Sequence, residues 1–159
     1  MLDGIASFAA SDTTLRSLPI AFLLGVIVGA EREWRQSTAA GLRSCVLVSV
    51  AAAAFADLMA TRVAPGNLGA GFGAIAQGVG FLGAGAILRE GVNVRGLSTA
   101  ATIWCVAAIG AQAGASETVG AIVLTVLVLL INTLLKPLQQ LIRRRRPAHR
   151  SAEDTALEG

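Results

Sequence analysis

One ionisable side chain in this sequence lies within a segment that otherwise carries no charge. Asp57 is the only charged residue between positions 44 and 61. An unpaired carboxylate in apolar surroundings is strongly destabilising, so Asp57 is a candidate functional group. On a helix, its same-face neighbours are the small residues Ala53, Ala54, Ala60 and Thr61. Two interpretations stay open: the carboxylate faces a helix or cavity, or it lies at a polar interface beside Arg62.

Three uncharged polar residues, Gln77, Gln112 and Asn132, lie in other apolar segments. We expect each to hydrogen-bond between helices; the alternative is a place on a permeation path. Asp57 and Gln77 are the candidate intramembrane polar site.

Elsewhere the sequence offers few candidate residues for catalysis or metal binding. The only histidine, His149, lies near the C-terminus, and Cys45 and Cys105 both lie in apolar segments. The stretch from Gly78 to Gly83 matches G-x-G-x-x-G, but no strand precedes it and no acidic residue follows about 20 positions on. We therefore expect no enzyme activity and no cofactor.

The amino-acid composition indicates the kind of fold that holds these candidate residues. Hydrophobic residues make up 54% of the chain and charged residues 14%, and there are 18 glycines. Soluble domains average roughly 25% charged residues, so this chain has too little polar surface for a soluble fold. Uncharged stretches at 17–30, 44–61 (apart from Asp57), 63–88, 96–116 and 118–135 predict five membrane-spanning helices.

The predicted fold class is therefore an all-α, polytopic membrane helical bundle. Residues 1–14 form an extracytoplasmic segment, 15–142 the five-helix transmembrane domain, and 143–159 a basic stop-transfer cluster with a disordered cytoplasmic tail. The first span has the shortest apolar run, with Pro19 expected in its first turn. The length and apolarity of this first segment are the only features that favour its crossing the whole membrane.

Basic residues set the expected orientation. With five spans, Arg16 and Arg62 lie on one side and the other 11 of the 13 basic residues on the opposite side. This asymmetry predicts a cytoplasmic C-terminus and an external N-terminus. The run from Arg143 to Arg146 is expected to bind anionic membrane lipid, and with no aromatic platform beside it we expect no nucleic-acid partner.

Glycines recur at the spacing used for close helix packing. The pairs are Gly25 and Gly29, Gly69 and Gly73, and Gly110 and Gly114. Glycine is densest in 69–86, so we predict that the third span is the hub of the bundle. A kink lining a cavity is the alternative for this segment.

Two polar segments lie on the predicted cytoplasmic side. Glu31 and Arg35 have the i, i+4 spacing of a helical ion pair, with Trp34 at the interface. The second segment is a short loop from Arg89 to Arg95, followed by Ser98 and Thr99 as candidate helix caps. Either these are solvated charges, or the two segments meet in a polar cluster.

Four ordered blocks carry a family resemblance. They are Gly29-Ala-Glu-Arg-Glu-Trp-Arg35, Ala40-Gly-Leu-Arg43, Gly78-Val-Gly-Phe-Leu-Gly-Ala-Gly-Ala-Ile-Leu-Arg-Glu90 and Gly91-Val-Asn-Val-Arg-Gly-Leu-Ser-Thr-Ala-Ala-Thr-Ile-Trp104. Through them, residues 18–135 resemble the MgtC/SapB family of bacterial inner-membrane proteins. The motif residues singled out by the resemblance are Glu31, Arg32, Arg43, Gly80, Gly83, Arg89, Asn93, Arg95 and Thr99.

The resemblance implies a multi-pass protein of the bacterial inner membrane linked to growth in low magnesium and, in pathogens, to virulence. It implies a non-enzymatic regulator that acts through other membrane proteins, with ATP synthase among the proposed targets, and we expect a homo-oligomer. The alternative that the resemblance leaves open is a small magnesium permease or channel, with Mg²⁺ as the one ion to consider. Mg²⁺ prefers carboxylate and carbonyl oxygens, so one intramembrane carboxylate per chain favours the regulator, although a dimer would bring two together. Well-known members carry a soluble domain after the fifth span, whereas this chain is expected to be a short form without it.

Overall fold

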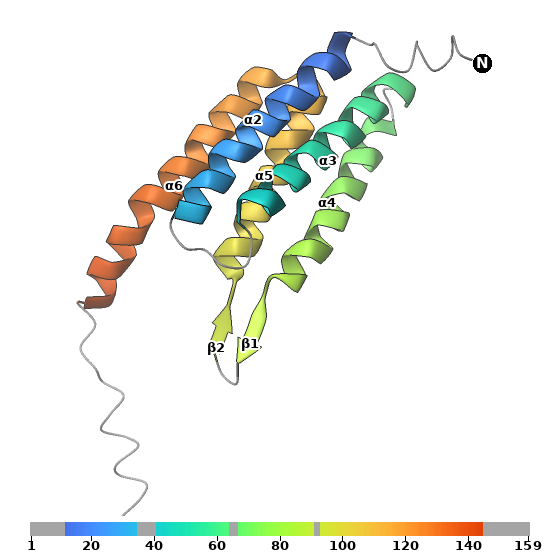
Figure 1. Cartoon of the computed structure of the whole chain (residues 1–159). Helices are drawn as coiled ribbons and strands as arrows, with labels where there is room; N and C mark the ends of the chain where they lie inside the picture. The colour runs from blue at the N-terminus through green and yellow to red at the C-terminus, as the bar shows by residue number, and fades with distance from the viewer. Residues whose placement is uncertain (1–11, 35–40, 64–66, 91–92, 145–159) are drawn as a thin grey trace, which may run out of the picture. The chain divides into compact units, whose positions relative to one another are not determined.

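Five long helices dominate the computed structural model, which describes residues 12–34, 41–63, 67–90 and 93–144 (Figure 1). The helices are α2 (Asp12–Trp34), α3 (Leu42–Arg62), α4 (Leu68–Gly85), α5 (Leu97–Gly114) and α6 (Thr118–Arg144). All five are long and apolar enough to cross a membrane. The predicted all-α, five-span fold class is confirmed. The first span covers Thr14–Trp34, which is long enough for a full crossing.

The chain forms two compact units, residues 1–129 and 130–159. The first contains α2 to α5 and the beginning of α6; the second contains the rest of α6, which is helical as far as Arg144. The predicted tail beyond Arg144 lies outside the described residues. At the other end, α2 begins at Asp12, which places Pro19 inside the helix and not in its first turn as predicted.

The buried centre of the first unit is α5, not α4. In α5, 56% of the residues are buried, against 11% in α4. The prediction that the third span is the hub is therefore wrong. A Cβ added at Gly69, Gly73 or Gly80 would meet no atom within 4 Å, so these glycines do not mediate contacts in the described chain. Glycine density does not indicate which face of a helix meets a neighbour.

The other two glycine pairs do mediate close packing. Gly110 and Gly114 of α5 lie against the backbone carbonyls of Ser49 and Ala53 of α3, where an added Cβ would clash. On α2, a Cβ at Gly29 would lie 2.9 Å from the Cα of Leu42. In lipid, this close backbone approach is a main source of helix association. The three helices α2, α3 and α5 therefore form the tightly packed part of the bundle.

A two-stranded ribbon connects α4 to α5 where the sequence predicted a loop. Strand β1 (Leu88–Glu90) pairs antiparallel with β2 (Asn93–Arg95), with Arg89 opposite Val94. Pairing satisfies backbone groups that lie outside the helices. Gly96 then starts α5 with a φ of 89°, a conformation that favours glycine. The predicted capping by Ser98 and Thr99 is wrong, because Gly96 occupies the N-cap and no side chain caps it.

Candidate functional site

An arginine is buried between α2 and α5. Arg32 is 5% exposed. Its Nη1 donates a hydrogen bond to Thr102 Oγ1 at 2.9 Å, and its Nη2 donates to Thr99 Oγ1 at 3.0 Å. We call Arg32, Thr99 and Thr102 the Arg32 cluster. Of the two interpretations of the polar segments, the structure supports contact between them at this point.

The spacing of residues on the two helices explains how the cluster forms. Arg32 follows Val28 by one helical turn and so continues the buried face of α2. Thr99 and Thr102 are three residues apart, so both hydroxyls lie on the same face of α5. The Thr102 hydroxyl donates its proton to the carbonyl of Ser98 at 2.9 Å, which leaves its lone pairs for the guanidinium.

A guanidinium suits this position because its planar fork offers parallel donors to two acceptors. Both hydroxyls are neutral, so neither compensates the positive charge. Glu31, the preceding residue, has a buried Oε1 atom. Cys45 is buried in α3, and a Cβ added at Gly29, three residues before Arg32, would lie 3.1 Å from the Cβ of Cys45. The cluster therefore lies at the junction of α2, α3 and α5, and its chemistry is that of a structural cross-link between helices.

A second acidic residue stabilises the start of α3. The Oε2 atom of Glu33 accepts a hydrogen bond from the backbone N–H of Leu42 at 3.1 Å. The N-cap residue, Gly41, has no side chain to perform this role. A carboxylate at a helix N-terminus is also favoured by the helix dipole. Sequence reasoning missed this contact, and the partner predicted for Glu31, Arg35, lies outside the described residues.

Asp57 lies near the opposite end of α2 and α3. It is 8% exposed, and its Oδ2 accepts a hydrogen bond from Thr14 Oγ1 at 2.6 Å. Of the two interpretations of Asp57, the structure supports the one in which the carboxylate faces a neighbouring helix. Thr14 was not singled out in the sequence, because it precedes the apolar run of the first span.

The two residues of the candidate polar site, Asp57 and Gln77, do not lie together in the structure. Gln77 is exposed on α4, whereas Asp57 is buried against α2. Among the motif glycines, Gly80 is exposed, and Gly83 is buried against Ala100 of α5.

The motif residues divide by their surroundings. Arg43 and Arg95 are exposed. Arg89 and Asn93 occupy paired positions on the ribbon, opposite Val94 and Glu90, and their side chains lie outside the described set. Arg32 and Thr99 are two motif residues that a hydrogen bond joins. Thr102 was missed, although its three-residue spacing from Thr99 was a signal available in the sequence.

Comparison with known proteins gives a consistent result. A family model described as the MgtC family matches residues 18–141. Protein MgtC of Salmonella typhimurium is 46% identical over 130 residues, which cover 80% of this chain and 54% of that protein. Protein MgtC of Brucella abortus is 46% identical over 132 residues, covering 81% and 54% respectively. The chain spans about half the length of these relatives. No solved structure matches the chain significantly.

Proposed function

Because the chain belongs to the MgtC family, we propose that this multi-pass membrane protein is a non-enzymatic regulator that supports growth in low magnesium. We place it in the bacterial inner membrane with its C-terminus in the cytoplasm, following the asymmetry of its basic residues. In this orientation the Arg32 cluster lies at the cytoplasmic end of the bundle and Asp57 at the external end.

The proposal rests on the hydrogen bonds that the two buried charged residues make to other helices. Arg32 donates to two threonines, and Asp57 accepts from Thr14. These bonds connect helices, so they hold the bundle in one arrangement. A permeation path needs polar groups that exchange bonds with a passing ion. The contacts therefore favour a protein that presents a fixed surface to a partner.

A magnesium permease is the less favoured alternative. Mg²⁺ keeps an octahedral shell of oxygen ligands and loses water reluctantly. Within the described part of the chain, no group of three His, Cys, Asp or Glu residues is placed to hold a metal ion. The proposed regulatory role therefore does not depend on binding of Mg²⁺ to this chain.

The partner is proposed to be another membrane protein, with ATP synthase as one candidate and a second copy of the chain as another. Among the described helices, α4 is the least buried, and its glycines at 69, 73 and 80 are open to close approach. Small residues on an outward face permit tight helix contact in lipid. We also propose that regulation of this partner contributes to virulence.

Growth of a deletion strain and magnesium flux into vesicles together test the proposal. We expect a deletion strain to grow poorly in low magnesium and to recover with the intact gene. Vesicles containing only the purified protein should show no magnesium flux above that of empty vesicles. Robust flux lost in Asp57→Asn would refute the regulator and establish the permease. A reporter fused at Gly159 tests the orientation, and activity on the external side would contradict it.

A further inference from the structure

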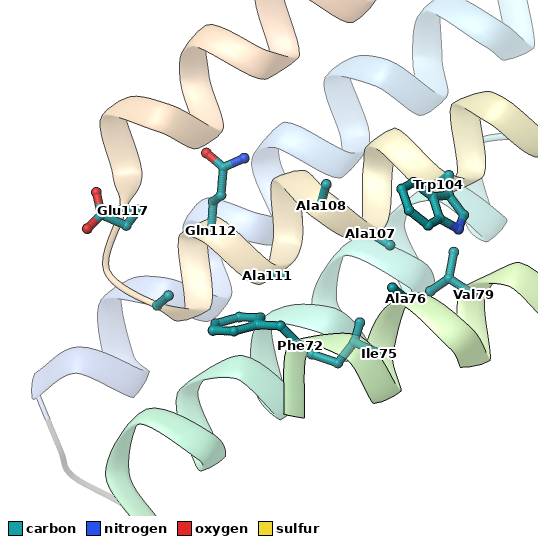
Figure 2. Close-up of a pocket in the computed structure, with 11 residues that line it drawn as sticks. Phe72, Ile75, Ala76, Val79, Trp104, Ala107, Ala108, Ala111, Gln112 and Glu117 are labelled. Atoms are coloured by element: carbon teal, nitrogen blue, oxygen red, sulfur yellow. The ribbon is translucent and has the colours of Figure 1, made fainter. Parts of the chain in front are cut away.

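An open, largely apolar groove separates α4 from α5 (Figure 2). Its volume is about 510 Å³, within the usual range for ligand sites. The lining residues used below are Phe72, Val79, Trp104, Ala108, Gln112 and Glu117. In Figure 2, Trp104 and Val79 lie at one end of the groove, and Glu117 lies at the other. The groove thus has an apolar end and a polar end.

The groove has the length of a single membrane leaflet. On α5 its lining extends from Trp104 to Ala115. At 1.5 Å per residue this stretch is about 16 Å long, close to half of the ~30 Å hydrocarbon core. Trp104 lies near the middle of α5, and Ala115 is its C-cap. The groove therefore extends from mid-membrane to one membrane face, as one lipid acyl chain does.

The polar end carries a negative charge. Glu117 is exposed, and its backbone N–H donates to the carbonyl of Gln112 at 2.8 Å, which holds it in the turn between α5 and α6. A carboxylate here attracts an ammonium group and repels an anionic headgroup. Phosphatidylethanolamine supplies an ammonium with charged N–H donors, whereas phosphatidylglycerol carries a net negative charge and supplies only neutral hydroxyl donors.

A second groove provides an internal comparison. It lies between α3 and α4, has a volume of about 540 Å³, and is lined by apolar residues including Phe55, Ala74 and Leu82. Its described lining contains no ionisable side chain. It is thus as large as the first groove but has no group that recognises a headgroup.

We infer that the groove between α4 and α5 binds one acyl chain of phosphatidylethanolamine, with the headgroup ammonium at Glu117. The apolar walls accept the chain, and Glu117 selects the headgroup. The groove between α3 and α4 takes up acyl chains without headgroup preference.

Tryptophan fluorescence tests the inference directly, because Trp104 lines the groove. The chain has two tryptophans, so Trp34→Phe leaves Trp104 as the only reporter. The protein is reconstituted into vesicles of equal phosphatidylethanolamine and phosphatidylglycerol. In one set the acyl chains of phosphatidylethanolamine are brominated, and in the other set those of phosphatidylglycerol are brominated. The two sets differ only in which lipid quenches.

We expect brominated phosphatidylethanolamine to quench Trp104 roughly threefold more effectively, the preference given by one exposed charge pair. Glu117→Gln should equalise the two lipids. Ala108→Leu, which fills the groove, should also remove the excess, whereas the matched control Ala74→Leu in the other groove should retain it.

Three results would overturn the inference. The first is equal quenching by both lipids in the parent protein. The second is an ethanolamine excess that survives Glu117→Gln, a surface substitution that is not expected to affect folding. The third is shielding of Trp104 from both lipids that disappears on dilution with excess lipid, because a second copy of the chain would then occupy the groove.

Discussion

Replacement of Arg32 tests whether the Arg32 cluster fastens α2 to α5. Arg32→Met keeps a long, flexible side chain in the buried position and removes both donors to Thr99 and Thr102. Interhelical hydrogen bonds in membranes contribute about 0.6 kcal/mol on average and at most about 1.7. Bonds from charged donors contribute about 1.5–3 kcal/mol in soluble proteins. For two bonds with a charged donor, we expect Arg32→Met to lower the unfolding free energy by about 2–4 kcal/mol.

A double-mutant cycle separates the bonds from the rest of the side chain. Thr99→Val alone should cost about 1–2 kcal/mol, and it should cost little in the Arg32→Met background because the donor is already absent. The assay is reversible unfolding in mixed micelles, followed by the loss of helix signal. Thr125→Val is the matched control: Thr125 is also buried, and its hydroxyl bonds only to a backbone carbonyl of its own helix.

The outcome that refutes the reasoning is a small coupling energy. If Thr99→Val costs the same with Arg32 present or absent, within about 0.5 kcal/mol, the observed bonds do not stabilise the bundle. A cost for Thr125→Val equal to that for Thr99→Val would likewise show that loss of any buried hydroxyl accounts for the effect.

Three further predictions concern the backbone contacts and Asp57. Gly110→Ala should destabilise the bundle by about 2 kcal/mol or more, because the added Cβ meets a backbone carbonyl of α3, whereas Gly73→Ala should have little effect in the same unfolding assay. Gly96→Ala should cost at least about 1–2 kcal/mol, because its φ of 89° and a nearby carbonyl both disfavour a Cβ; equal stability would contradict this conformation. Asp57→Asn retains an acceptor for Thr14 and should be less destabilising than Asp57→Leu by about 1 kcal/mol, with equal losses arguing against the bond.

The number and position of the helices were predictable because each depends on a local property. Charged residues are gathered between apolar stretches, and a membrane span requires an apolar stretch of fixed length. The ribbon before α5 was not predicted, because its two strands have three residues each. Three residues are too few to show the alternation of apolar and polar side chains that indicates a strand.

The candidate site was predicted in part. The resemblance singled out Arg32 and Thr99, but the bond between them depends on the packing of α2 against α5, which is a long-range property. Thr14 was missed because it precedes the apolar run of the first span. Thr102 was missed although its three-residue spacing from Thr99 places both hydroxyls on one face of a helix. Gln77 was grouped with Asp57 by depth alone, and depth does not determine which way a helix face points.

The unequal burial of the helices has a consequence for how the protein responds to its surroundings. Only 11% of α4 is buried, and grooves lie on both of its flanks. In a bilayer, acyl chains therefore contact most of the surface of α4. The ribbon of β1 and β2 links its end to the start of α5, the most buried of the five helices. A change in the thickness or composition of the surrounding lipid is therefore expected to affect α4 more than α5.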